Sequence, residues 1–327
     1  MEAYKNSKIF TEEKTRIKAQ LTENGVPENQ ADTVADCFAT ADIFGVKTHG
    51  EKVLPAHIKK IQSGFYNLNP NFKVKKETAA FAVIDGDNAI GCVSAMHCVE
   101  YAIERVKKSG IYTVFSPSNN TFGAAFCYAL KAAEQGYFAI VASNSPAQMT
   151  AMGGATKMLG TNPFAAVIPV ADGQPVIIDM ATSIVAKSKF KEYAESGKML
   201  PDGWALDKNG NPTNDPNAAI NGFVLPMAGF KGYGIALLID YIAGLLSGAA
   251  YLNHVGRFYS EDGECMNVGF YIQIVDVKAV FGENYDKAIA KYVAEIRNGK
   301  SAEGKKAVLP GDDRYEYMKK LIGAENK

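Results

Sequence analysis

The chain contains four histidines, and one of them stands in a segment suited to proton transfer. His49 lies near the end of the segment ADIFGVKTHG (residues 41–50), directly after a predicted helix, with Lys47 and Thr48 beside it. A histidine on a constrained loop is a good general acid, because its pKa starts near about 6.5. These residues alone support a catalytic role and a capping or surface role of His49 equally.

Two glycine-rich segments could approach an anionic ligand closely. GFKGYG (residues 229–234) is expected directly before a long helix, where free backbone N–H groups and Lys231 would face an anion. A tight turn before a buried helix explains the same residues equally well. GGATKMLGTNP (residues 153–163) stands near the end of a predicted strand, where ligands of open α/β sheets gather.

Other common sites are not indicated by the sequence. No GxGxxG follows the first predicted strand, so the usual dinucleotide fingerprint is missing. GxSxG, HExxH, Walker A and EF-hand patterns are also missing, and the acidic residues form no evident metal cluster, so no metal is expected. His97 falls within a predicted amphipathic helix, which favours a structural role, and His254 has no companion. The residues therefore indicate an α/β protein with an anion-binding loop and one well-placed histidine.

Composition excludes several classes of protein. The 327 residues are 47% hydrophobic, which suits one compact body or two modest domains. Lys plus Arg is 35 and Asp plus Glu is 35, and this zero balance argues against nucleic-acid or membrane-surface binding. The start MEAYKNSKIF has no apolar core of signal-peptide length, so we expect no secretion. Five cysteines without a CxxC pair predict reduced thiols in the cytoplasm. Residues 234–252 are strongly apolar but contain Asp240, so we expect a buried helix there.

The elements that position these residues begin with two helices. Thr11 can cap a helix that ends near Gly25, and Pro27 can open a second helix that ends at Gly45. The apolar face of the second helix consists of Ala31, Val34, Ala35 and Phe38. From about residue 78 the pattern changes to alternating strands and helices, which is typical of an α/β sheet.

Several elements of that sheet can be predicted individually. Strands are expected over 79–86, 111–118, 137–145 and 269–277, and helices over 122–135 and 285–297. Another helix, closed by Gly110, has an apolar face of Val99, Ala102, Ile103 and Val106. Residues 164–170 and 175–181 predict a hairpin joined at residues 171–174, which gives the sheet antiparallel character. Residues 200–217, which include Trp204, predict a long ordered loop.

These motifs together resemble a known family. ADIFGVKTHG, NNTFGAA, NSPAQM, GGATKMLGTNP, DMATS, PDGWALDKNGNPTNDP, LPMAGFKGYG and VLPGDD are similar, in order and over nearly the whole chain, to the non-Rossmann malate/L-lactate dehydrogenase family. That family includes sulfolactate and ureidoglycolate dehydrogenases, diketogulonate reductase and cyclic-imine carboxylate reductases. The resemblance implies a homodimeric oxidoreductase that uses NAD or NADP on a non-Rossmann α/β fold with a mixed sheet.

The resemblance also implies three regions and their roles. Residues 1–77 would form a helical region that carries the catalytic histidine, and residues 78–282 the cofactor-binding α/β domain. Residues 283–327 would form helices that pack with the N-terminal region. By matching motif, His49 would be the acid/base, Asp179 would orient it, and Thr48 would bond the substrate. The implied cofactor-binding residues are Met180, Ala181, Lys231, Gly232, Pro310, Gly311 and Asp312.

The chain departs from the family pattern where relatives contact substrate. Thr48 replaces a serine but keeps the hydroxyl, and Val53 stands at the usual arginine position. His57 replaces a tyrosine, and Thr121 replaces the histidine of the NSNHFG block. The expected substrate-binding residues are Lys52, His57, Asn120 and Thr121, with Lys47, Arg257 or Arg314 as alternative carboxylate anchors.

We therefore expect hydride transfer between NAD(P)H and a small 2-oxo/2-hydroxy carboxylate of the malate or lactate type. Two alternatives stay open: a reductase of cyclic imine carboxylates or related amino-acid precursors, and a catalytically silent relative. Neither NAD nor NADP is favoured by the sequence.

Overall fold

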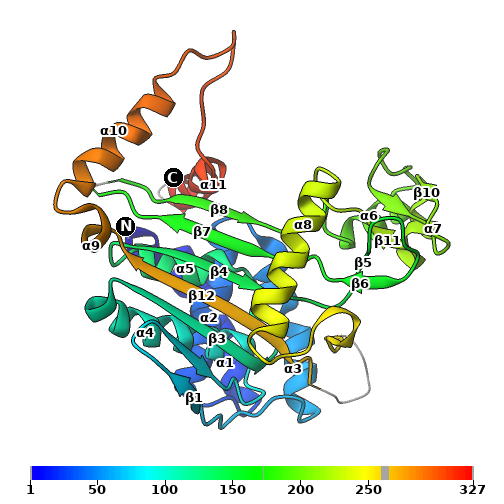
Figure 1. Cartoon of the computed structure of the whole chain (residues 1–327), viewed down its shortest axis with the longest axis horizontal. Coiled ribbons are helices and arrows are strands. Elements are labelled where there is room, and N and C mark those ends of the chain that lie inside the picture. The colour runs from blue at the N-terminus through cyan, green and yellow to red at the C-terminus, as the bar shows by residue number, and fades with distance from the viewer. Residues whose placement is uncertain (1, 172, 259–264, 326–327) are drawn as a thin grey trace.

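The computed structural model describes residues 2–171, 173–258 and 265–325, and a seven-stranded sheet forms its centre (Figure 1). In spatial order the strands are β1 (Val74–Glu77), β2 (Phe81–Ile84), β3 (Ile111–Asn119), β12 (Val268–Asp276), β4 (Tyr137–Ser143), β7 (Phe164–Ile168) and β8 (Val176–Met180). β2 and β3 are parallel, and the other neighbouring pairs are antiparallel. The predicted mixed α/β fold and the β7–β8 hairpin are confirmed; Asp172, in its turn, lies outside the described residues.

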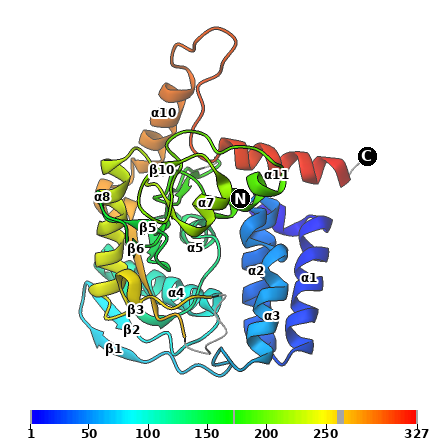
Figure 2. The same ribbon diagram turned by 90° about the vertical axis from the view of Figure 1, so that its right-hand side faces the viewer.

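Two helices cover one face of the sheet, and the N-terminal helices lie outside them (Figure 2). α4 (Gly91–Ser109) packs on β3 and β12, and α5 (Phe126–Ala133) packs on β4 and β7. The predicted apolar face of α4 is buried, and Gly110 ends the helix with a φ of 74°. The predicted helix over 122–135 is confirmed but begins later, at Phe126.

Three helices form the N-terminal layer: α1 (Lys8–Glu23), α2 (Glu28–Ile43) and α3 (Leu54–Gln62), with η1 (Glu2–Asn6) before them. Ser7, rather than Thr11, caps α1, because the Ser7 hydroxyl accepts the N–H of Phe10. Thr11 instead donates its hydroxyl to the carbonyl of Ser7. Two short 3-10 turns, η2 (Lys47–His49) and η3 (Glu51–Val53), separate α2 from α3. These breaks leave His49 on a constrained turn between helices.

The opposite face of the sheet carries α8 (Phe230–Ile239) and the π-helical turn η4 (Asp240–Leu245). Ile239 and Ala243 pack on Ala142 of β4. The prediction that GFKGYG precedes the helix is wrong: Gly229, with a φ of 60°, is the N-cap, and α8 begins at Phe230. The expectation of a buried helix over 234–252 is also wrong, since side chains such as Leu238 and Tyr241 are exposed. Nothing in the described part of the chain covers that outer side.

A smaller lobe projects from the sheet beside α8 (Figure 1). Its elements are β5 (Met149–Thr150), β6 (Lys157–Leu159), α6 (Ser188–Glu195), β9 (Ala205–Leu206), β10 (Pro212–Thr213), α7 (Pro216–Asn221) and β11 (Phe223–Val224), with η5 (Leu252–His254) against β6. Phe190, Leu200 and Val224 belong to a separate apolar core of this lobe. The segment predicted as a loop over 200–217 therefore contains β9, β10 and the start of α7.

The C-terminal helices are α9 (Val277–Phe281), α10 (Tyr285–Arg297) and α11 (Asp312–Glu325). α11 packs against α1 and α2, so it joins the N-terminal layer. α10 packs elsewhere: Ile289 forms an apolar cluster with Val170 and Val176 at the β7–β8 hairpin. Of these helices, α11 is therefore the one that reaches the neighbourhood of His49.

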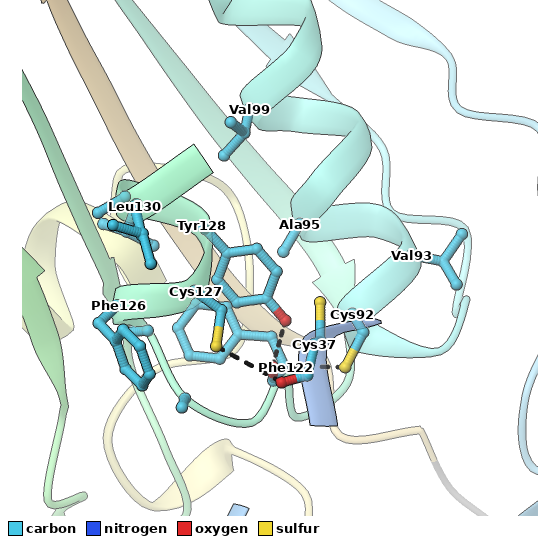
Figure 3. Close-up of a cluster of buried hydrophobic side chains, with 14 of the residues drawn as sticks. Cys37, Cys92, Val93, Ala95, Val99, Phe122, Phe126, Cys127, Tyr128 and Leu130 are labelled. Atoms are coloured by element: carbon cyan, nitrogen blue, oxygen red, sulfur yellow. Dashed lines mark hydrogen bonds between the residues drawn. The ribbon is translucent and has the colours of Figure 1, made fainter. Parts of the chain in front are cut away.

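Buried cysteines line the core between α2, α4 and α5 (Figure 3). The Cys92 thiol donates to the carbonyl of Phe122, and the Cys127 thiol donates to the carbonyl of Cys37. The Tyr128 hydroxyl also donates to the Phe122 carbonyl. All five cysteines are free. Among the described residues, every helix is too short or too polar to cross a bilayer.

Candidate active site

The turn that carries His49 is fixed by the end of α2. Gly45 takes a φ of 81°, and the N–H of Val46 bonds the carbonyl of Ala41 at 2.7 Å. The N–H of His49 then bonds the carbonyl of Val46 at 2.9 Å. Thr48 Oγ1 lies 2.9 Å from His49 Nδ1 and forms a hydrogen bond with it. This contact occupies Nδ1 and leaves Nε2 of the imidazole for a ligand.

His49 is exposed in the described chain, yet its surroundings disfavour the charged imidazole. Partial desolvation by the neighbouring protein lowers its pKa below the usual value, and the positive charge of Arg314 lowers it further. Close to neutral pH the ring is therefore mostly uncharged. An uncharged imidazole is ready to accept a proton, and it becomes a proton donor below its pKa.

Arg314, in the first turns of α11, forms the electrostatic centre of the site. Its Nη2 donates to Asp179 Oδ2 at 2.9 Å and to the carbonyl of Asp179 at 3.3 Å. Its guanidinium lies 4.9 Å from the ring centroid of Phe126. Burial raises the pKa of Asp179, and the Arg314 charge opposes that rise. Nη1 of Arg314 is buried and has no hydrogen-bond partner among the described residues.

A cavity of about 430 Å³ joins the His49 turn to α11. Its lining residues are Phe44, Gly45, Val46, Lys47, Thr48, Asp313, Arg314 and Tyr317. Lys47 and Arg314 bring two cations to this hollow, Asp313 brings a carboxylate, and Thr48 and Tyr317 bring two hydroxyls. His49 does not line the hollow, but it bonds Thr48, which does. This arrangement can bind an anionic group and place it beside a proton donor or acceptor.

The predicted cofactor residues lie along the edge strand β8 and the segment after it. Met180 is exposed at the end of β8, and Ala181 follows it. The carbonyl of Thr182 accepts the N–H of Met227 at 2.9 Å, which brings the DMATS segment beside the start of α8. At Gly232 a methyl group would overlap the Met227 carbonyl, so only glycine fits this approach. Lys231 is exposed in the same turn.

The PGDD segment runs beside β8. The carbonyl of Pro310 accepts the N–H of Ile177 at 3.1 Å, and Gly311 takes a φ of 91° against that strand. Both oxygens of Asp312 are occupied, by the N–H of Leu309 at 2.8 Å and by Arg297 Nη2 at 2.7 Å. The Asp312 carboxylate therefore stabilises the start of α11 and thereby the position of Arg314.

The predicted substrate residues are not gathered in this cavity. His57 is only 3% exposed; its Nδ1 lies 2.9 Å from the Tyr66 hydroxyl, and burial lowers its pKa to about 4. Asn120 is fully buried, and its amide bonds Asn88 and Ala89. Lys52 is exposed on η3, but the cavity is lined by Lys47 instead.

Thr121 is half-buried, in the segment that lies behind the His49 turn. A Cβ on Gly123, two residues further on, would lie 3.8 Å from the His49 carbonyl oxygen.

Sequence reasoning named Arg314 only as an alternative anchor and did not single out Asp42 or Glu13. Arg314 follows Gly311 by three residues, and its partner Asp179 stands 135 positions earlier, so local patterns could not pair them. Asp42 stands within ADIFGVKTHG, and an acidic residue near the end of an apolar helix is the signal that the sequence offers. Its burial becomes visible only in the structure.

Comparisons with known proteins show the family to which this fold and sequence are similar. The family model described as malate/L-lactate dehydrogenase matches residues 10–322. A malate dehydrogenase of Pyrococcus horikoshii is 37% identical over 289 residues, which cover 86% of this chain and 79% of the relative. The solved structure of sulfolactate dehydrogenase from Methanocaldococcus jannaschii has a TM-score of 0.89 and 33% identity, over 95% of this chain and 90% of that chain. An NAD(+) ureidoglycolate dehydrogenase of Escherichia coli K12 is 32% identical, over 77% and 72% of the two chains.

Proposed function

Because the chain belongs to the malate/L-lactate dehydrogenase family, and is thus an NAD- or NADP-dependent 2-hydroxyacid dehydrogenase, we propose that its substrate reacts in the cavity beside His49. The observation that carries this proposal is the meeting of Thr48, Lys47 and Arg314 around one hollow of about 430 Å³. A hydroxyl and two cations suit a small molecule that carries a carboxylate next to the reacting oxygen.

His49 is the group that moves the proton. When the 2-hydroxy acid is oxidised, neutral His49 accepts the hydroxyl proton at Nε2, because Thr48 occupies Nδ1. In the reverse direction the imidazolium returns that proton to the carbonyl oxygen. The Arg314 charge lowers the pKa of His49, which keeps the imidazole ready to act as a base near neutral pH.

Arg314 and Lys47 are the proposed carboxylate anchors, in place of the family's arginine at position 53. The buried Nη1 of Arg314 has no hydrogen-bond partner in the described part of the chain, and a substrate carboxylate would supply one after a small shift of the side chain. Asp179 holds Arg314 through Nη2 and so fixes the direction of the guanidinium fork. We therefore give Asp179 a role in orienting Arg314 rather than in contacting His49 directly.

We propose that residues along β8 and α8 bind the dinucleotide. Gly232 admits no side chain, and Lys231 beside it adds an exposed positive charge. We assign cofactor binding to these two residues, to Met180 and Ala181, and to the backbone of the Pro310–Gly311 turn. When bound there, the nicotinamide donates or accepts the hydride at the substrate carbon.

We further propose that the protein is a homodimer in the cytoplasm. Exposed apolar side chains repeat along the outer side of α8 and η4, in a set called here the α8 stripe: Phe230, Leu237, Leu238, Tyr241, Leu245 and Leu246. Phe230 is 73% exposed and Leu238 is 56% exposed, and a stripe without charged members suits a second copy of itself across a two-fold axis. The five free thiols favour a reducing compartment.

A substrate panel tests this function. Oxidation of malate, sulfolactate and lactate is measured with NAD and with NADP, alongside reduction of a cyclic imine carboxylate with both reduced cofactors. The proposal expects the highest kcat/KM for one of the 2-hydroxy acids. Turnover of the imine alone would favour an imine reductase, and cofactor binding without turnover of any compound would favour a silent relative.

A further inference from the structure

A buried carboxylate lies directly behind the His49 turn. Asp42, near the end of α2, is 3% exposed. Its Oδ2 accepts the N–H of Glu51 at 2.6 Å, and its Oδ1 lies 3.3 Å from Lys47 Nζ. These partners stand two residues before and two residues after His49. One carboxylate therefore ties both sides of the turn to α2.

The same contact explains the glycine that follows the histidine. A methyl group on Gly50 would overlap the Asp42 carboxylate, so the backbone can approach the carboxylate only without a side chain. Gly50 has a φ of −102°, which any residue can adopt, so close packing rather than backbone strain requires glycine here. The His49 turn is pressed onto Asp42 as well as hydrogen-bonded to it.

A second acidic side chain supports Asp42 from α1. Burial and the neighbouring Asp42 carboxyl raise the pKa of Glu13 well above its ordinary value, so Glu13 keeps its proton near neutral pH and can donate it to Asp42. Arg16, also on α1, forms a bidentate contact with Glu51: its Nε and Nη2 each lie 2.7 Å from a Glu51 carboxylate oxygen. Glu13 and Arg16, both on α1, therefore face Asp42 before the His49 turn and Glu51 after it.

We propose that Asp42 is the positioning residue that holds the His49 turn in its reactive geometry, through its contacts with Glu51, Lys47 and Gly50. This proposal rests on the proposed role of His49. Asp42 does not contact the cavity; it acts through the backbone of Glu51 and the ammonium group of Lys47. The Glu51 N–H and the Lys47 ammonium group satisfy one oxygen each of this buried side chain.

The proton on Glu13 gives this arrangement a pH dependence. Burial and the neighbouring Asp42 raise the pKa of Glu13 to about 8. The charged groups that face Glu13 are Asp42 of α2, Lys47 of η2, Glu51 of η3 and Arg16 of its own helix. α11, which also packs on α1, contributes Asp313 and Arg314 to the adjoining cavity. Above about pH 8 Glu13 ionises and repels Asp42 and Glu51, which loosens the turn.

Folding stability reports the same proton without any need for activity. In the unfolded chain Glu13 loses its proton near its ordinary pKa of 4.5, whereas the folded chain keeps it up to about pH 8. The folded state therefore binds more protons in this window, and stability falls as the pH rises from 4.5 to 8. Glu13→Gln keeps a donor to Asp42 and removes the titration. Glu12→Gln is the matched control, because the Glu12 side chain is 62% exposed on the same helix.

The test compares the wild type, Glu13→Gln, Glu12→Gln and Asp42→Asn as full-length proteins. The difference in melting temperature between Glu13→Gln and the wild type should become more positive as the pH rises from 5 to 8. The difference between Glu12→Gln and the wild type should not change with pH. In the oxidation direction, where His49 is neutral, the wild type should lose kcat above about pH 8, and Glu13→Gln should keep it. Asp42→Asn should lower kcat about tenfold to a hundredfold with the cofactor Kd unchanged.

The proposal can still be tested if Asp42→Asn does not fold or if the protein oxidises no hydroxy acid. If Asp42→Asn fails to fold, the comparison of Glu13→Gln with Glu12→Gln still decides, because both variants keep Asp42. If no variant oxidises a hydroxy acid, the proposed function has failed. The imidazole NMR signal of His49, assigned by its loss in His49→Gln, then replaces kcat: it should broaden above pH 8 in the wild type but not in Glu13→Gln. Identical pH profiles and identical melting curves for the wild type and Glu13→Gln would overturn the proposal.

Discussion

The ion pair between Asp179 and Arg314 gives the most quantitative prediction. At 2.9 Å and an effective dielectric constant of about 20, the attraction between the two charges is about 6 kcal/mol. Desolvation of both groups offsets much of it, since their side chains are only 18% and 12% exposed. Removal of one partner from such a buried pair costs about 3–5 kcal/mol, because the other charge is left without a partner. We expect the loss of unfolding free energy to be about 3 kcal/mol, because some solvent reaches both groups.

A double-mutant cycle measures this energy. Unfolding free energies are determined by urea for the wild type, Asp179→Asn, Arg314→Leu and the double variant. Each single variant should lose about 3 kcal/mol, and the double variant should lose much less than the sum. For a chain of 327 residues the loss corresponds to a melting temperature lower by about 4 °C in each single variant.

The same variants should move the pH profile in opposite directions. Asp179→Asn leaves the Arg314 charge unopposed, so the pKa of His49 falls further and reduction of the oxo acid is confined to lower pH. Arg314→Leu removes that charge, so the pKa of His49 rises and reduction continues to higher pH. A coupling energy below about 0.5 kcal/mol would mean that solvent screens the pair, and the electrostatic reasoning would then be refuted.

Three further predictions concern other parts of the molecule. Lys231→Met should raise the cofactor Kd, measured by titration of protein fluorescence, without a change in melting temperature; unchanged affinity would remove GFKGYG from the cofactor site. Leu238→Asp in the α8 stripe should convert the dimer to a monomer in light scattering, and a wild-type monomer would contradict the proposed dimer. His57, with a pKa of about 4, should make the wild type lose about 3 kcal/mol of stability between pH 6.5 and 4, because only the unfolded chain gains the proton. His57→Phe should remove this loss in urea titrations, and an equal loss in the variant would show that another group titrates.

The helices and strands with a regular apolar pattern could be predicted from the sequence. The face of Val99, Ala102, Ile103 and Val106 is buried as expected, because a helix on a sheet must bury one side. For these regular elements the errors fall at their ends. Ser7 and Thr11 are equally good caps by residue type, and packing of Tyr4 against Phe10, with ring centroids 5.5 Å apart, accompanies the earlier start at Ser7.

The apolar segment after Gly229 shows a different limit. Its hydrophobicity predicts a buried helix, but Leu237, Leu238 and Tyr241 are exposed in the single chain. Sequence hydrophobicity cannot distinguish a side chain buried within one chain from one covered by a second copy.

The candidate site shows which contacts local sequence patterns cannot predict. The His49 turn could be recognised, because its residues are consecutive. Arg314 is joined to Asp179 across 135 positions, and Glu13 meets Asp42 from another helix, so neither pair has a local signature. His57 was predicted to contact substrate from its position in a motif, but Phe258 and Tyr66 pack against its ring in the described chain. Burial of a polar residue in this way depends on distant parts of the chain.

The central claim is that His49 transfers the proton, and His49→Gln tests it most directly. The measurement is kcat for oxidation of the best 2-hydroxy acid from the panel, with the cofactor Kd measured in parallel. His254→Gln is the matched control, because His254 is exposed on η5. We predict that His49→Gln lowers kcat by about 10²–10⁴-fold with the cofactor Kd unchanged, while His254→Gln keeps full activity. A His49→Gln enzyme with kcat close to that of the wild type would contradict the account.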